Sequence, residues 1–159
     1  MTRLRFINCR AAALAVTRRY LLVMAGANFA WEVVQLPLYT IWHTASWAYL
    51  GFATLHCWVG DLLIAAAAFA CGALIAGRFW PMRGYVRAGL LIVVLGIAYT
   101  VFSEWLNVVV RGSWAYTPAM PRVPPLGTGL APLLQWLLLP TMSLVWARGA
   151  LLSVKVANR

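Results

Sequence analysis

The sequence ATLHCWVGDLLIAAAAFACGALIAG, residues 53–77, is an apolar run that contains a single acidic residue, Asp61, and neither lysine nor arginine. A helix needs about 20 consecutive apolar residues to cross the hydrocarbon core of a bilayer, and this run supplies them. Its second half is rich in alanine, and the small residues Ala68, Gly72 and Ala76 recur every four positions. Small residues at this spacing let helix backbones approach closely, so we expect this half to pack against a neighbouring helix.

Three further apolar runs of similar length lie at about residues 20–41, 88–110 and 129–147. The chain is 64% hydrophobic and only 10% charged, whereas a soluble domain has roughly a quarter of its residues charged. The sequence therefore predicts an all-α fold, an integral membrane bundle of four transmembrane helices within a domain at 20–147. A basic arm at 1–19 is expected to lie on the membrane surface, and 148–159 is expected to form a basic tail.

The basic residues predict the orientation of the bundle. Five of them lie in the amino-terminal arm, three in the loop at 78–87 and three in the tail, against only Arg111 and Arg122 in the other two loops. Because cytoplasmic loops carry an excess of Lys and Arg, we expect both termini in the cytoplasm and the protein in a bacterial inner (plasma) membrane. The net charge of +10 does not indicate a nucleic-acid partner, because the basic residues lie between apolar runs rather than in one patch.

All three acidic residues of the chain, Glu32, Asp61 and Glu104, fall inside predicted spans. An ionisable side chain at bilayer depth costs at least about 2.5–3.5 kcal/mol on insertion scales, so it should face the bundle interior and have a partner. At about 1.5 Å per residue, these acids and Gln135 lie about 9–14 Å below the outer surface. Four helices of alternating direction thus bring polar groups to one layer, which predicts a polar pocket in the outer half of the bundle.

Other polar and aromatic side chains fall near the same layer, in the spans or in the loop that follows the third span. We predict catalytic acid and base roles for the three carboxyl groups. We expect a further set of side chains to bind the substrate, namely Asn28, Gln35, His56, Asn107, Arg111, Trp114, Tyr116, Arg122 and Gln135. The alternative for each buried polar residue is a structural role, because such residues also join transmembrane helices through hydrogen bonds.

The sequence contains no recognised cofactor or metal motif. It has no E-x-x-H, H-x-x-x-H or C-x-x-C spacing, no phosphate loop and no nucleotide-binding signature. We therefore expect neither a metal nor a cofactor, and no ATP-driven or hydrolytic chemistry of the common soluble kinds. The three cysteines, Cys9, Cys57 and Cys71, are interpreted as packing residues.

Two short stretches resemble known membrane enzymes. The run from Asn107 through Gly112-Ser-Trp114-Ala-Tyr116, with the later helix opening Ala131-Pro-Leu-Leu-Gln135, is similar to the G-x-W-x-(F/Y) segment and P-L-E-E helix of the integral-membrane lycopene-cyclase-like carotenoid proteins. The run Asn28-Phe-Ala-Trp31-Glu32 resembles an acid-bearing segment of the membrane-bound meroterpenoid cyclases. These families are thought to protonate an alkene or epoxide with intramembrane carboxyl groups.

The resemblance is limited to about a quarter of the chain and departs at the acid pair. Leu134 and Gln135 stand where the carotenoid family has its two acids, which leaves Glu32, Asp61 and Glu104 to carry any proton chemistry. The chain as a whole is also similar to small bacterial four-span membrane proteins, a resemblance that implies no activity.

Three functions remain open from the sequence. The first is a membrane-embedded enzyme that uses carboxyl groups for acid and base chemistry on an isoprenoid or other lipid, with a cyclase, isomerase or hydratase reaction. The second is a small proton- or cation-coupled transporter, although the inner halves of the spans carry almost no polar residues to continue a pathway. The third is a non-catalytic binding or assembly subunit of a homo-oligomer or larger membrane complex.

Overall fold

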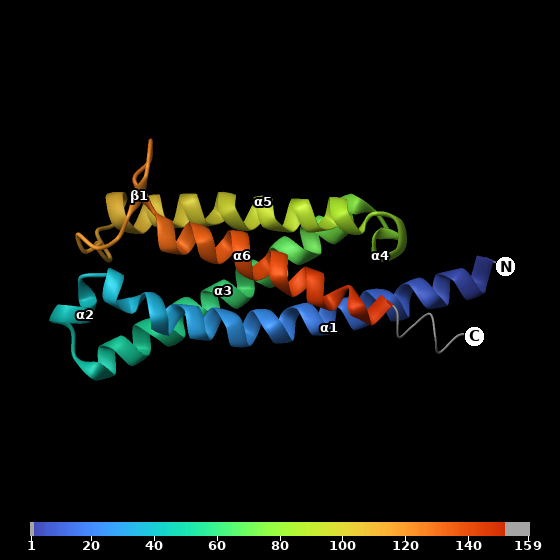
Figure 1. Ribbon diagram of the computed structural model, residues 1–159, viewed down its shortest axis with the longest axis horizontal. Coiled ribbons are helices and arrows are strands. Elements are labelled where there is room, and N and C mark those ends of the chain that lie inside the picture. The colour runs from blue at the N-terminus through green and yellow to red at the C-terminus, as the bar shows by residue number, and fades with distance from the viewer. Residues whose placement is uncertain (1, 152–159) are drawn as a thin grey trace.

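A computed structural model describes residues 2–151, with side chains from residue 9 onward. The long elements are α1 (Thr2–Gln35), α3 (Trp47–Ala76), α5 (Tyr85–Glu104) with its π-helical continuation η2 (Trp105–Val110), and α6 (Leu130–Ala147). The connections contain η1 (Leu36–Leu38), α2 (Ile41–Thr44), α4 (Trp80–Arg83) and the antiparallel strands β1 (Arg122–Val123) and β2 (Thr128–Gly129). Figure 1 shows α1 and α5 lying lengthwise, with α3 and α6 inclined between them.

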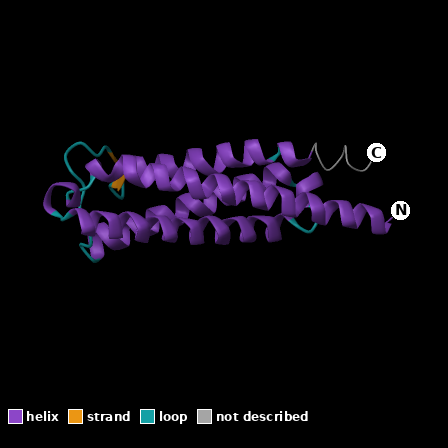
Figure 2. Ribbon diagram, turned by 90° about the horizontal axis from the view of Figure 1, so that it is seen from below, coloured by secondary structure: helices purple, strands orange, loops and turns teal. Residues whose placement is uncertain are grey.

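Four helices in the described residues are long and apolar enough to cross a membrane. These spans are Cys9–Leu38, Trp47–Ala76, Tyr85–Val110 and Leu130–Leu151. The prediction of an all-α protein with four transmembrane helices is therefore confirmed at this level. The start of α1 and the end of α6 lie at the same end of the bundle, as four crossings require (Figures 1 and 2). We call the opposite end, which carries α2 and the β1–β2 hairpin, the outer end.

The boundaries of two elements differ from the expected ones. No break separates the arm at 1–19 from the first span, because residues 2–25 contain neither Gly nor Pro and are rich in strong helix formers. The connection expected at 42–52 is shorter, because Ser46 caps α3 by accepting a hydrogen bond from the Tyr49 amide at 3.3 Å. Most of the predicted tail at 148–159 lies outside the described residues.

The inner half of the bundle is closely packed around an apolar core. An added Cβ at Gly72 of α3 would lie 2.7 Å from Ile92 Cγ1 and 3.0 Å from the Ala88 carbonyl oxygen of α5. Only glycine permits this approach, which agrees with the packing surface predicted from the small-residue spacing. Tyr20 and Phe69 complete the contact of α1 with α3, with ring centroids 4.8 Å apart.

The connection after η2 is tied to the end of the first span. Tyr39 and Tyr116 form an antiparallel bridge. The Thr40 amide donates to the Ala115 carbonyl at 2.9 Å, and the Thr117 amide donates to the Leu38 carbonyl at 2.9 Å. The loop is thereby fixed over the outer ends of α1, α5 and α6, and Tyr116 is directed inward.

The helices α3 and α5 separate toward the outer end. They are in contact at Gly72 and Ile92 near the inner end, whereas Figure 1 shows the start of α3 beside α2, well away from the end of α5. The space between the outer halves of these two helices contains the candidate site.

Candidate functional site

A cavity of about 530 Å³ lies in the outer half of the bundle, lined by all four spans and by the loop after η2. The three carboxyl groups of Glu32, Asp61 and Glu104 all belong to its lining. Its volume is within the range of roughly 300–1,000 Å³ that is typical of small-molecule sites. The acids are thus brought together around one cavity.

Glu32 of α1 and Asp61 of α3 form a hydrogen-bonded carboxyl pair. Both side chains are buried. Two carboxyl groups can hydrogen bond to each other only when one of them carries a proton, because an ionised carboxylate is an acceptor only. Gln35, one turn further along α1, donates its amide to Glu32 Oε1 at 2.7 Å. The two carboxyl groups are therefore placed to share a proton, in a site that Gln35 helps to orient.

Gln135 of α6 joins this pair to the rest of the bundle. Its Nε2 donates to Asp61 Oδ2 at 2.7 Å and to Asn28 Oδ1 at 2.9 Å, and lies 3.3 Å from Glu32 Oε1. An amide nitrogen has two hydrogens, so the long contact with Glu32 is the weakest of the three. Asn28 in turn donates to the Met24 carbonyl at 2.8 Å and does not line the cavity. Asn28 thus supports Gln135 from behind rather than facing a ligand.

Glu104 is the centre of a second, separate cluster. The Tyr116 hydroxyl donates to Glu104 Oε2 and accepts a hydrogen bond from the Gly129 amide at 3.0 Å. Burial raises the pKa of Tyr116 well above its usual value, and the hydrogen bond to Glu104 raises this pKa further. The phenol therefore stays protonated and acts as a donor to Glu104. Trp114 Nε1 lies nearby, buried and without a partner of good geometry, although its indole interacts with the Glu104 carboxyl.

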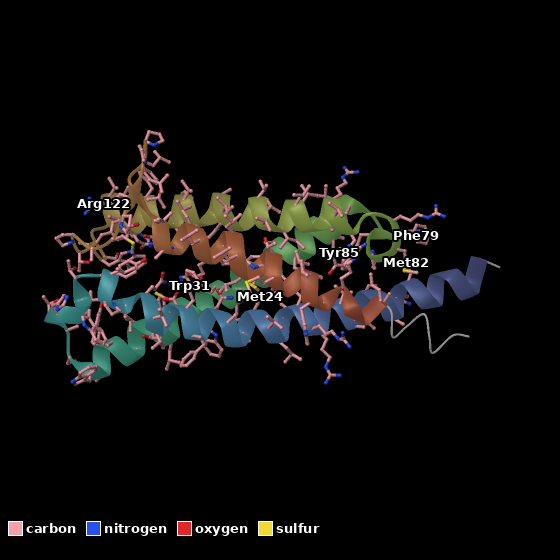
Figure 3. All side chains as sticks on the ribbon, viewed as in Figure 1. Met24, Trp31, Phe79, Met82, Tyr85 and Arg122 are labelled. Carbon is pink, nitrogen blue, oxygen red and sulfur yellow. The ribbon has the colours of Figure 1, made fainter. Side chains whose placement is uncertain are left out.

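Within the described residues, the three carboxyl groups form hydrogen bonds with glutamine amides, with the Tyr116 phenol and, in the carboxyl pair, with each other. Arg111 lines the cavity at its outer end, while Arg122 lies outside the lining with its guanidinium 5.4 Å from the ring centre of Tyr116. Figure 3 shows Arg122 among the loop side chains at the outer end.

The structure places the predicted residues in three groups. All three predicted catalytic acids line the cavity, as do six of the predicted binding residues: Gln35, His56, Asn107, Arg111, Trp114 and Gln135. Tyr116 reaches the site through Glu104, and Asn28 reaches it through Gln135. Arg122 is outside the cavity lining, and its contact with a substrate stays a prediction.

Several lining residues were not predicted. Cys57 lies four residues before Asp61, and Thr100 lies four residues before Glu104, so helical spacing from the acids could have identified both. Tyr39 could not be found in this way, because it reaches the cavity only through the bridge between η1 and the distant loop. The aromatic residues Tyr49, Phe52, Tyr99 and Phe102 of the lining were not predicted either.

No group of three or more His, Cys, Asp and Glu side chains is arranged to hold a metal ion within the described part of the chain. Comparisons with family models, with curated proteins and with solved structures found no match to the chain. The chemistry of the site is therefore inferred from its own residues.

Proposed function

We propose that the protein is a membrane-embedded enzyme that carries out acid and base chemistry on an isoprenoid or other lipid inside this cavity. The observation that carries the proposal is the Glu32–Asp61 pair, which shares a proton beside a cavity that also contains Glu104. Two carboxyl groups that share one proton supply both an acid and a base, as in other carboxyl dyads. General acid and base groups must lie within reach of the same substrate, and a common cavity provides this.

The walls of the cavity support an apolar substrate. Tyr49, Phe52, Tyr99 and Phe102 contribute aromatic rings on two sides, and Trp136 contributes another from α6. Aromatic faces stabilise a cation placed over them, including one that develops during a reaction. Because these rings lie within the apolar spans, the substrate is expected to arrive from the bilayer rather than from water.

These features fit proton-initiated isomerisation, cyclisation or hydration of a carbon–carbon double bond. In the simplest case the shared proton adds to one alkene carbon, whose π electrons form the new C–H bond. The neighbouring carbon becomes cationic. A carbon next to this cationic centre then gives a proton to a carboxylate, and the electrons of its C–H bond form the new double bond, which restores the proton count. This isomerisation requires no oxidant, reductant or cofactor, and the protein provides acid, base and apolar walls.

The proposed orientation of the bundle decides in which half of the membrane the cavity lies. With the basic loop at 78–87 and both termini on the cytoplasmic side, the cavity lies in the outer half of a plasma membrane, of bacterial inner-membrane type. A transporter is supported less well, because the described layer beneath the cavity consists of buried apolar side chains, among them Met24, Phe69 and Ile92. The buried hydroxyls of Tyr20 and Ser143 among the described residues of this half have no hydrogen-bond partner, so they do not form a hydrogen-bonded chain from the carboxyl layer.

The test is a comparison of lipid extracts from cells with and without the gene, by mass spectrometry. The variants Glu32→Gln, Asp61→Asn and Glu104→Gln are compared with Thr141→Val, an exposed position whose hydroxyl bonds only to its own helix. The proposal is supported by a lipid whose amount differs from that in cells without the gene when the wild type or Thr141→Val is expressed. The amount of this lipid should not differ when Glu32→Gln or Asp61→Asn is expressed. If all three acid variants fold and their lipid extracts are the same as the extract from wild-type cells, the enzyme proposal is overturned. Proton flux in proteoliposomes that requires the acids would support transport instead.

A further inference from the structure

The cavity opens sideways, between α3 and α5. Phe52 on α3 is 63% exposed, and Tyr99 and Phe102 on α5 are 47% and 51% exposed, yet all three also line the cavity. A side chain that both lines a cavity and reaches the bundle surface marks an edge of its mouth. Further in, the contact of Gly72 with Ile92 closes the gap between the same two helices. The opening therefore faces the hydrocarbon region of the outer leaflet.

The outer rim of this opening carries positive charge and hydrogen-bond donors. Arg111 is the only lysine or arginine among the residues that line the cavity. Asn107, four residues before Arg111, and Ser113, two residues after it, also belong to the lining. The acids lie deeper: Glu104 precedes Arg111 by seven residues, about two helical turns. The cavity is thus cationic at its interfacial rim and carries carboxyl groups only in its apolar depth.

We propose that the ligand is a single-chain amphiphile with an anionic head group, which enters from the bilayer between α3 and α5. The head group binds Arg111 at the rim, and the hydrocarbon chain lies between the aromatic walls, beside the carboxyl pair and Glu104. Arginine forms strong, charge-assisted hydrogen bonds with phosphate and carboxylate groups. This inference rests on the proposed function wherever it concerns a reaction. It adds that the reacting bond lies in the hydrocarbon chain of the ligand, about two helical turns below the head group.

The test uses two photoreactive probes of equal chain length, hexadecyl phosphate and hexadecanol, each with a diazirine in the chain. The full-length protein is reconstituted in neutral phosphatidylcholine nanodiscs, and labelled peptides are identified by mass spectrometry. We expect the phosphate probe to label peptides that contain residues 49–64 and 99–107. We expect Arg111→Gln to lower labelling by the phosphate about tenfold, the loss of one charge-assisted hydrogen bond, while labelling by the alcohol is unchanged.

A pair of glycine variants tests the route. An added side chain at Gly60, which lines the cavity, would meet nothing within 4 Å, and the same is true of Gly26, which faces outward on α1 away from the cavity. Gly60→Trp should fill the opening and lower labelling by both probes about tenfold, an amount equivalent to roughly 1.4 kcal/mol of binding. Gly26→Trp adds the same side chain and should leave labelling unchanged. If Gly60→Trp does not fold, the Arg111→Gln variant, at an exposed position, still tests whether the cavity binds an anionic amphiphile.

Equal labelling in the two tryptophan variants, or an equal response of both probes to Arg111→Gln, overturns the inference. Complete competition by inorganic phosphate would also overturn it, because the site would then hold a free anion rather than an amphiphile. The acid variants separate this inference from the proposed function. If the wild type is labelled as expected but no lipid is converted, the ligand class stands and the enzyme proposal fails.

Discussion

The side-chain amide of Gln135 on α6 donates to Asp61 on α3 at 2.7 Å, across 74 residues of sequence. The same nitrogen bonds to Asn28 of α1 at 2.9 Å, so one side chain joins three of the four spans. The Glu32–Asp61 pair therefore depends on α6, although α6 contributes no acid of its own. Gln135 is a positioning residue for the pair.

Replacing Gln135 should loosen this junction. Gln135→Leu has a similar size but leaves buried oxygens of Asp61 and Asn28 without a donor, each worth about 1–3 kcal/mol when unsatisfied. We expect a lower midpoint of thermal unfolding in detergent, measured by tryptophan fluorescence. Thr141→Val on the same helix is the control and should stay near the wild type. An unchanged midpoint for Gln135→Leu would show that the hydrogen bonds to Gln135 do not hold the spans together.

The Tyr116–Glu104 contact predicts that the stability of the protein depends on pH in the alkaline range. Burial, and then the hydrogen bond to Glu104, raise the pKa of Tyr116 above its reference value of 10.0. A group whose pKa is higher in the folded state stabilises that state fully below the unfolded pKa, and this stabilisation is lost as pH rises toward the folded pKa. The stability of the wild type should therefore fall with pH above about 10, and the fall should be smaller in Tyr116→Phe.

The measurement is urea or thermal unfolding at a series of pH values from neutral to strongly alkaline. Tyr49→Phe, the same substitution at an exposed tyrosine, is measured in parallel as the control. Equal slopes for wild type and Tyr116→Phe would contradict the prediction. At neutral pH Tyr116→Phe should also be less stable, since the Gly129 amide loses its acceptor.

Two glycines of α3 should respond to alanine in opposite directions. Gly72→Ala places a methyl group 2.7 Å from Ile92 Cγ1, so α3 and α5 must move apart, at a cost of about 1–3 kcal/mol. Gly51→Ala meets nothing within 4 Å and should stabilise the helix by about 0.5–1 kcal/mol. Thermal unfolding of the two variants, prepared in parallel, gives the sign of each change. A stabilised Gly72→Ala variant would show that the two helices are not closely packed there.

The proposed orientation predicts which loops can be labelled from outside the cell. In a variant with its native cysteines replaced by alanine, Arg122→Cys should react with a membrane-impermeant maleimide in intact cells. Arg83→Cys, in the connection at the other end of the bundle, should react only after the membrane is opened. The reverse pattern would place the cavity in the cytoplasmic half. Labelling of both positions in intact cells would show that the membrane was not sealed.

The connections show where local sequence patterns lose their predictive value. The four spans follow from length and hydropathy, but the start of α3 depends on the single cap at Ser46. Tyr39 was not predicted as a site residue, because its position results from a bridge to Tyr116 in a distant loop. The position of Arg122 over the Tyr116 ring likewise depends on the β1–β2 hairpin rather than on a pattern within one span.

The sequence by itself determined four apolar spans and the common depth of Glu32, Asp61, Glu104 and Gln135. Depth can be counted along each helix, since every residue adds about 1.5 Å. Only the tertiary structure decided that Glu32 pairs with Asp61 while Glu104 bonds to Tyr116. The pairing depends on how each helix is rotated about its axis and on where α3 and α5 separate, and these follow from side-chain packing between spans rather than from any pattern within one span.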